Sequence, residues 1–148
     1  MKAVYRRTYK EGYTLTISDL PKPAAGKQEI LVKIYATTLN RTDCAIITGK
    51  PYIMRLFTGI FKPASPIPGT DFAGVVEEIG ANVQGFEVGD RVFGFDDTGL
   101  HTMAEYATVP VKKAIAHIPA DIHYDEAAAS VEGLHYALNF INKVTLHA

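Results

Sequence analysis

PGTDFAGVVEEIGANVQGFEVGDRV, residues 68–92, is the stretch of sequence that decides the fold. Its glycines are spaced between short apolar runs, and glycine permits tight turns and close backbone approach because it has no Cβ atom. Gly89-Asp90 is typical of a turn into a following strand. The apolar positions Val76, Val83 and Val92 are expected to fill the interior of a β-barrel.

Further strands are predicted on both sides of this segment. The strongest is EILVKIYATTLN, residues 29–40, in which apolar side chains alternate along one face. The other strand-like runs cover residues 2–8, 13–18, 72–80, 90–95, 103–110 and 112–119, with a turn expected at 10–12. Turn signals recur about every ten residues, which is typical of a compact β-barrel or sandwich.

Two helices and one long loop complete the expected architecture. Residues 41–48 form a short helix, with Asn40 as its N-cap and Gly49 as its C-cap. Residues 50–68 are expected to be a long loop. From residue 124 the spacing becomes helical, with an apolar stripe made by Ala128, Val131, Tyr136, Leu138 and Ile141. The fold class is therefore mainly β (α+β).

Composition excludes several classes of function. The 15 Lys and Arg against 16 Asp and Glu give a formal charge of -1, without the basic surplus that nucleic-acid binding requires. Cys44 is the lone cysteine, so neither an internal disulfide nor a cysteine-rich zinc site can form. No run approaches the roughly 20 apolar residues of a membrane span, and the charged N-terminus is unlike a signal peptide. We expect a cytoplasmic protein that contacts neither nucleic acid nor membrane.

The segment 68–92 resembles the medium-chain dehydrogenase/reductase superfamily. The matching positions are Gly69, Gly74, Val76, Gly80, Val83, Phe86, Gly89, Asp90 and Val92. The resemblance implies a GroES-like catalytic domain over residues 1–123, built as a partly open β-barrel. It implies that residues 124–148 are a connector helix leading to a Rossmann domain, whose Gly-rich turn is not found in this sequence. By this resemblance the chain is the N-terminal part of an oxidoreductase and is inactive alone.

The resemblance also implies that zinc is absent. Zinc-dependent relatives carry a cysteine where this chain has Asn40, and Gly-His-Glu where it has Gly69-Thr70-Asp71. Amide and hydroxyl groups are poor replacements for thiolate and imidazole as zinc ligands. The expected family member is therefore a zinc-free quinone oxidoreductase. The alternatives are a zinc-dependent alcohol dehydrogenase, a non-catalytic GroES-like binding module, or a naturally short regulatory relative.

In such enzymes NADPH or NADH delivers hydride to a quinone, an enone or a similar apolar carbonyl acceptor. The resemblance places Asn40 and Asp43 on the floor of the active site, with the Asn40 amide donating to a substrate oxygen. Thr70 could donate a hydroxyl, and Asp71 would hold the local backbone or pair with a cation. The competing interpretations are that Asn40 caps a helix, that Asp43 serves the helix N-terminus and that Asp71 stabilises its turn.

Two further contacts are expected around this site. Tyr52 and Phe57 lie in the apolar part of the 50–68 loop and are predicted to face the substrate, although an oligomer contact or a self-packed loop is an alternative. Tyr136 is predicted to face the cofactor, with core packing as the alternative. A homo-oligomer is expected. The sequence does not distinguish NADH from NADPH, since the residues that bind the 2′-phosphate belong to the Rossmann domain.

Overall fold

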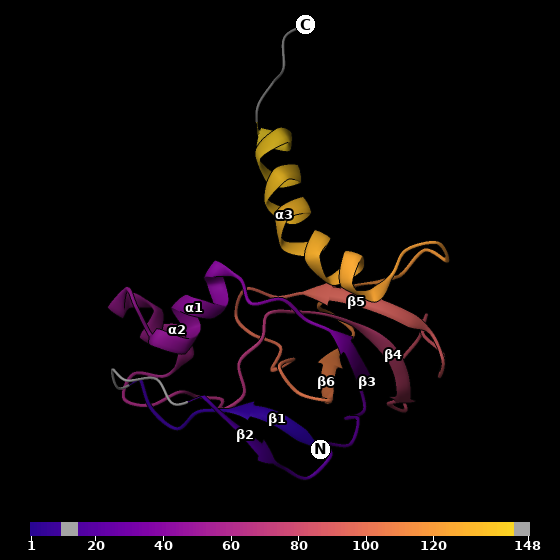
Figure 1. Cartoon of the computed structure of the whole chain (residues 1–148). Coiled ribbons are helices and arrows are strands. Elements are labelled where there is room, and N and C mark those ends of the chain that lie inside the picture. Colours follow the sequence, from indigo (N-terminus) through magenta and orange to yellow (C-terminus); the bar gives the residue numbers. More distant parts are fainter. Residues whose placement is uncertain (10–14, 144–148) are drawn as a thin grey trace, which may run out of the picture.

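The computed structural model of the chain describes residues 1–9 and 15–143 (Figure 1). The strands are β1 (Lys2–Tyr5), β2 (Thr16–Asp19), β3 (Glu29–Ala36), β4 (Asp71–Ile79), β5 (Arg91–Phe95), β6 (Tyr106–Pro110) and β7 (Ala114–His117). The helices are α1 (Arg41–Thr48), the short 3-10 helix η1 (Tyr52–Met54), α2 (Arg55–Thr58) and α3 (Tyr124–Lys143). The expected mainly β architecture is confirmed.

Two sheets make a partly open barrel. Five antiparallel strands are ordered β6-β3-β4-β5-β7, and β1 and β2 form a separate ribbon. The ribbon is tied to the larger sheet by a bridge between Ala3 and Ala104, and by the Val4 amide, which donates to the Met103 carbonyl at 2.8 Å. The sheets are not closed on each other, as the resemblance implied.

The barrel interior is filled by the apolar residues of the central strands. The core cluster consists of Ile30, Val32, Phe72, Val76, Val92, Leu100 and Val109. Val83 and Phe86 pack against it from the connection between β4 and β5. The interior positions predicted for Val76, Val83 and Val92 are therefore confirmed. Burial of these aliphatic side chains is the main stabilising contribution to the barrel.

Several strands are shorter than predicted. The run 29–40 ends as a strand at Ala36, because the next residues turn to bond with Asp71. The predicted strand 103–110 begins only at Tyr106. The second strand is Thr16–Asp19, and the turn expected at 10–12 lies outside the described residues. The prediction of an unstructured loop over 50–68 is wrong for residues 52–58, which form η1 and α2.

Both predicted helices are present, and α1 carries its predicted caps. Asn40 is the N-cap, and Gly49 ends α1 in the left-handed conformation at φ 59°. Helix α3 packs only its first turns on the sheet, through Ala127 and Ala128. The remainder of α3 projects away from the barrel in Figure 1, with most of its apolar stripe exposed. Across residues 1–9 and 15–143, every helix is too short or too polar to cross a bilayer.

Candidate functional site

Antiparallel pairing of β3 and β4 brings the predicted catalytic residues together. Ala36 at the end of β3 is paired with Ala73 near the start of β4. The loop from β3 into α1 therefore lies beside the residues that open β4. Asn40 and Asp43 belong to the first segment, and Thr70 and Asp71 to the second. The two segments are about thirty positions apart in sequence, and their four residues form one polar cluster.

Asn40 is the centre of this cluster. Its Nδ2 donates to the Thr70 hydroxyl at 2.8 Å and to the Asp71 carboxylate at 3.1 Å. Its Oδ1 accepts from the Asp43 backbone amide at 2.8 Å, while the Asp43 carboxylate accepts from the Asn40 amide at 3.1 Å. The last two bonds form a capping box that satisfies backbone donors at the start of α1. The helix-capping interpretation of Asn40 and Asp43 is therefore correct, whatever further role the two residues have.

Asp71 organises the chain between β3 and α1. Its carboxylate accepts from the Thr38 amide at 2.7 Å, from the Thr37 hydroxyl at 3.2 Å and from the Thr38 hydroxyl. Asp71 is fully buried, and within the described residues no lysine or arginine is paired with it. A carboxylate with this many donors is stable in the barrel wall without a cation. Of the two roles predicted for Asp71, the geometry supplies the one that holds the local backbone.

Asp43 has a less complete environment. It is fully buried, and its Oδ1 has no hydrogen-bond partner. Burial raises the pKa of Asp43 to about 6; the Asn40 amide opposes this rise, and the charge of Asp71 adds to it. Only Asn40 among the four cluster residues is partly exposed, because Asp43, Thr70 and Asp71 all have an exposed fraction of zero.

A groove between α1 and α3 lies next to the cluster. Its volume is about 630 Å³, and the lining residues are Arg41, Thr42, Ala45, Met54, Asp97, Glu132, Gly133 and Tyr136. The Thr42 hydroxyl donates to the Glu132 carboxylate at 2.8 Å and so links the two helices. We call this the α1–α3 groove. It contains Tyr136, the predicted cofactor contact, together with Arg41 and Thr42, which the sequence reasoning missed although they directly follow Asn40.

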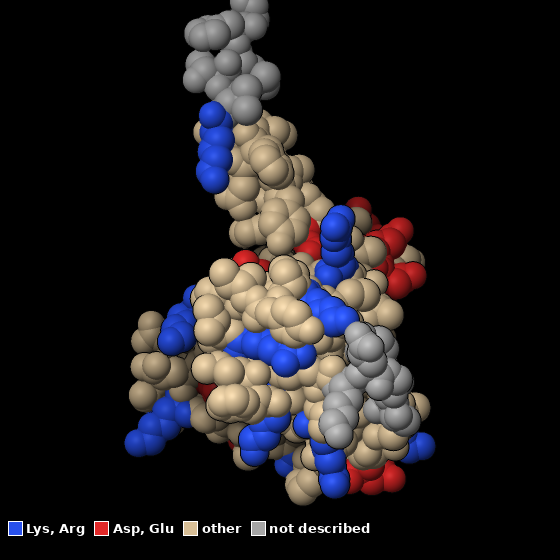
Figure 2. Space-filling view, turned by 90° about the vertical axis from the view of Figure 1, so that its left-hand side faces the viewer, with Lys and Arg blue, Asp and Glu red and all other residues tan. Residues whose placement is uncertain are grey.

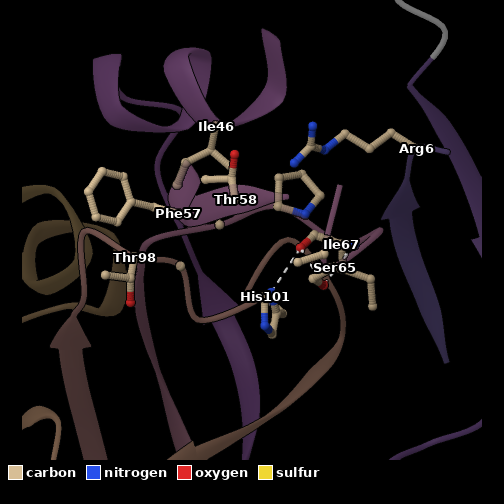
Figure 3. Close-up of a pocket in the computed structure, with 12 residues that line it drawn as sticks. Arg6, Ile46, Phe57, Thr58, Ser65, Ile67, Thr98 and His101 are labelled. Atoms are coloured by element: carbon tan, nitrogen blue, oxygen red, sulfur yellow. Dashed lines mark hydrogen bonds between the residues drawn. The ribbon is translucent and has the colours of Figure 1, made fainter. Parts of the chain in front are cut away.

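The predicted substrate contacts lie apart from this groove. Tyr52 and Phe57 are 69% and 71% exposed on η1 and α2. The Tyr52 ring centroid is 4.9 Å from the Arg55 guanidinium carbon. Phe57 lines a second cavity, which also contains Arg6 and His101 (Figure 3). From this segment only Met54 is among the residues that line the α1–α3 groove, and the substrate contact of Tyr52 and Phe57 stays a prediction.

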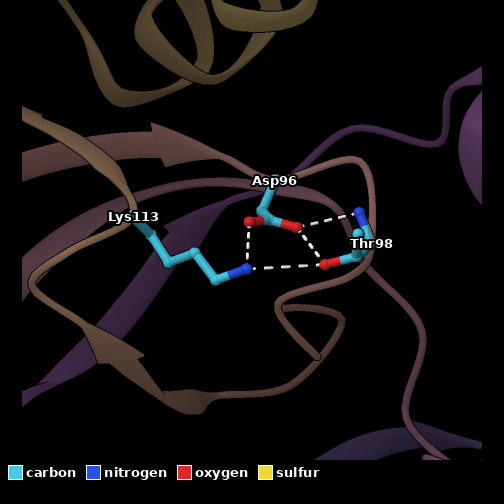
Figure 4. A network of polar contacts seen from close by, with 3 residues as sticks. All are labelled: Asp96, Thr98 and Lys113. Carbon is cyan, nitrogen blue, oxygen red and sulfur yellow. Dashed lines mark hydrogen bonds and ion pairs between the residues drawn. The ribbon is translucent and has the colours of Figure 1, made fainter.

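A short polar network fixes the loop that follows β5 (Figure 4). Asp96 pairs with Lys113 and accepts from the Thr98 hydroxyl and, at 2.8 Å, from the Thr98 amide. Burial favours the neutral form of Asp96, but Lys113 and Thr98 outweigh it and lower the pKa of the carboxyl. The loop is thereby held so that Asp97 lines the α1–α3 groove and Thr98 lines the second cavity.

The four side chains of the polar cluster are an amide, a hydroxyl and two carboxylates. The Asn40 amide is partly exposed, and the other three groups are buried. In residues 1–9 and 15–143, no three His, Cys, Asp or Glu side chains are grouped so that they could hold a metal ion. Cys44 is exposed, and its position follows Asp43 on α1. The donor set is therefore suited to hydrogen bonding with an uncharged oxygen, whereas zinc prefers thiolate and imidazole ligands.

Comparison with known proteins shows the family to which the chain belongs. A family model described as "Alcohol dehydrogenase GroES-like domain" matches residues 26–120. Quinone oxidoreductase from Rattus norvegicus is 38% identical over 113 residues, which cover 76% of this chain and 31% of the rat protein.

Two solved structures are similar over almost the whole chain. The quinone oxidoreductase from Coxiella burnetii has a TM-score of 0.82 and 26% identity, over 97% of this chain and 44% of its own. Mycobacterial Rv1454c, complexed with NADPH, has a TM-score of 0.74 and 27% identity, over 98% of this chain and 43% of its own. This chain thus spans less than half the length of each of these proteins. It belongs to the medium-chain dehydrogenase/reductase superfamily as a quinone oxidoreductase-like member with an alcohol dehydrogenase GroES-like domain.

Proposed function

We propose that this chain is the substrate-side part of an NAD(P)H-dependent oxidoreductase that reduces a quinone, an enone or a similar apolar carbonyl acceptor without zinc. The observation that carries the proposal is the hydrogen-bonded pair of Asn40 and Thr70, with 2.8 Å between Nδ2 and Oγ1. These two residues occupy positions at which zinc-dependent relatives carry metal ligands. In this chain they carry neutral polar side chains instead.

The α1–α3 groove fits the nicotinamide end of such a cofactor. A volume of about 630 Å³ is within the usual range for small-molecule and cofactor sites. Tyr136 offers an aromatic ring from one wall, and Arg41 and Thr42 offer polar groups from the other. When bound, the reduced nicotinamide supplies the hydride. The residues of this chain would hold that ring and leave the polar cluster to the acceptor.

The polar cluster is suited to stabilise negative charge on the acceptor oxygen. Charge develops on a carbonyl oxygen during its reduction, and fixed donors stabilise that charge without reorganising. Asn40 is the cluster residue that is partly exposed, so we assign the acceptor contact to its amide. The side-chain amide of Asn40 already donates to Thr70 and to Asp71. A bound acceptor oxygen therefore shares one of these N–H groups with its present partner. Thr70, Asp71 and Asp43 then act as positioning residues that fix the amide.

The experiment combines Asn40→Ala with Thr70→Val in a protein that carries this chain together with a nucleotide-binding domain. We expect kcat/KM with a quinone or enone to fall at least tenfold, because one charge-stabilising donor and its support are removed. Cys44→Ser is the matched control, since Cys44 is exposed on the same helix, and it should leave kcat/KM unchanged. An unaltered kcat/KM in the double variant would remove both residues from the site.

Metal analysis tests the zinc-free part of the proposal separately. We expect substoichiometric zinc in the purified protein and no loss of activity on dialysis against a chelator. One equivalent of zinc that is lost together with activity would favour the alcohol dehydrogenase alternative.

A further inference from the structure

A second cavity has Gly69, the neighbour of Thr70 in sequence, in its wall, and the proposed function does not use it. Its volume is about 350 Å³. It is lined by Arg6, Ile46, Phe57, Thr58, Ala64, Ser65, Ile67, Pro68, Gly69, Thr98, Gly99 and His101. Figure 3 shows the Arg6 side chain entering from the β1 side and extending toward Thr58, with His101 on a different wall. We call it the Arg6 cavity.

Arg6 is a buried cation for which the described residues supply no counter-charge. Its exposed fraction is 5%, its Nη1 donates to the Ile47 carbonyl at 2.9 Å, and its Nε has no hydrogen-bond partner. The Tyr9 ring centroid lies 5.2 Å from its guanidinium carbon. In the described part of the chain, no carboxylate forms an ion pair with it. Buried charges are normally paired, because removing an ion from water is strongly unfavourable unless an opposite charge compensates it.

Arg55 adds a second positive charge near Arg6, whereas the surroundings of His101 favour its neutral form. The guanidinium carbon of Arg55 is 4.7 Å from the same Tyr9 ring. His101 is held at a positive φ of 61°, and its Nδ1 is 3.1 Å from the Ile67 carbonyl. Burial lowers the pKa of His101, and the nearby charge of Arg6 lowers it further, while the Ile67 carbonyl opposes this.

The molecular face beside the Arg6 cavity also carries mostly positive charge (Figure 2). Figure 2 shows the face with α1 and α2, where lysine and arginine side chains predominate and acidic side chains lie near the edges. Between Asp43 and Asp71 the sequence contains Lys50, Arg55 and Lys62 and has no aspartate or glutamate. A cleft within such a field concentrates anions.

We propose that the Arg6 cavity is a binding site for a small oxyanion, either a carboxylate or a phosphate, with the Arg6 guanidinium as its charge partner. An anion supplies the missing counter-charge, and charge-assisted bonds to a guanidinium are the strongest that such a site can make. The cavity is larger than either ion, so the oxyanion can be part of a larger molecule. The site goes beyond the proposed reductase function and does not depend on it.

Binding is measured on the chain itself, by thermal unfolding and by calorimetry. Sodium phosphate and sodium acetate are titrated separately at an ionic strength kept constant with sodium chloride. We expect the melting temperature to rise with one or both oxyanions and to remain constant with chloride alone, because a ligand that binds only the folded state stabilises it. The two arms distinguish a tetrahedral phosphate site from a planar carboxylate site.

Arg6→Gln and Arg7→Gln form the matched pair for this measurement. Both substitutions remove one positive charge at neighbouring positions, but Arg7 is exposed and does not line the cavity. We expect Arg6→Gln to weaken the oxyanion affinity more than about tenfold and Arg7→Gln to leave it unchanged. An equal response of both variants, or no response of the unmodified chain to either oxyanion, would overturn the proposal.

A second variant keeps the test valid if Arg6→Gln does not fold. Ala64→Phe retains Arg6 and places a large ring at an exposed position of the cavity wall. It should reduce oxyanion binding by occupying the cavity. Undiminished binding in a folded Ala64→Phe variant would locate the oxyanion elsewhere and refute the proposed site. Since no hydride acceptor is used, failure here leaves the reductase proposal untouched.

Discussion

At the scale of single residues, Asp43 and Arg6 are two charged groups whose buried environments leave them incompletely satisfied. Asp43 lacks a partner for one carboxylate oxygen, and Arg6 lacks one for its Nε. Asp43 belongs to the polar cluster, and Arg6 lines the second cavity. Unsatisfied buried groups are rare in folded proteins and are often found at functional positions. Their effects on stability can be measured without a substrate.

Asp43→Asn tests the raised pKa of Asp43. The pKa rises from 3.8 to about 6 in the folded state, so folding favours the protonated carboxyl. The protonated Asp43 carboxyl contributes its full stabilisation below the unfolded-state pKa of 3.8. This contribution is lost as the pH rises through about 6, because the unfolded state ionises first. The asparagine variant has no such loss. Relative to the unmodified chain, its free energy of unfolding should therefore improve by about 2 kcal/mol between pH 4 and pH 7.

Urea titrations at a series of pH values measure this difference. Asp121→Asn is the control, since Asp121 is exposed, and its profile should stay parallel to that of the unmodified chain. Parallel profiles for Asp43→Asn as well would show that the buried carboxyl does not titrate in this range.

At the scale of secondary-structure elements, glycines set how closely neighbouring segments approach. Gly80 follows β4, and its amide donates to the Glu29 carbonyl at 2.9 Å. A Cβ atom at position 80 would lie 1.9 Å from the Gly26 carbonyl oxygen. The obstacle is backbone rather than a movable side chain, so the two segments would have to separate. Gly80 is one of the nine positions that carry the family resemblance, and this contact is the physical reason for glycine there.

Gly80→Ala is expected to destabilise the chain by at least about 2 kcal/mol, because relieving the collision disrupts the end of the β3–β4 pairing. Gly133→Ala is the matched control within α3, where a Cβ atom would meet nothing within 4 Å. That substitution should be neutral or raise helix stability by up to about 1 kcal/mol, since alanine has the higher helix propensity. Chemical denaturation followed by circular dichroism compares the two, and equal effects would contradict the close-approach explanation.

At the scale of the whole molecule, large apolar side chains are exposed on two segments, the outer part of α3 and the η1–α2 region. The outer part of α3 exposes Leu134, Leu138 and Ile141 at 53%, 49% and 55%, and their spacing places them on one helix face. The η1 and α2 segment exposes further large side chains, including Tyr52 and Phe57. Apolar patches of this kind mark interaction surfaces in proteins.

The α3 face predicts reversible self-association of the chain. We expect the sedimentation coefficient to increase with protein concentration, and the double substitution Leu138→Glu with Ile141→Glu to suppress this increase. Ile17→Glu is the control, since Ile17 is 77% exposed on β2, away from α3. If the unmodified chain stays monomeric at all concentrations, or if Ile17→Glu has the same effect as the double substitution, the α3 face is not the contact.

Local patterns predicted most of the elements. The capping residues of α1, the start of α3 at residue 124 and the buried valines of the barrel were all predicted from neighbouring residues. The exceptions have a physical cause. The strand predicted to residue 40 stops at Ala36, because Thr37 and Thr38 donate hydrogen bonds to Asp71, which is far away in sequence. Residues 52–58 are helical although prolines and apolar residues surround them.

The sequence by itself determined the superfamily and the order of the strands and of α1 and α3, because these depend on motifs and on spacing within short segments. The family resemblance carried by those motifs pointed to the four residues of the polar cluster. Only the tertiary structure decided which groups have partners. It showed that Asn40 donates to Thr70 and Asp71. It also showed that, among the described residues, one oxygen of Asp43 has no hydrogen-bond partner and Arg6 is buried without a counter-charge. Hydrogen bonding and desolvation depend on distances between segments far apart in the chain, and these distances are set only when the sheets and helices pack together.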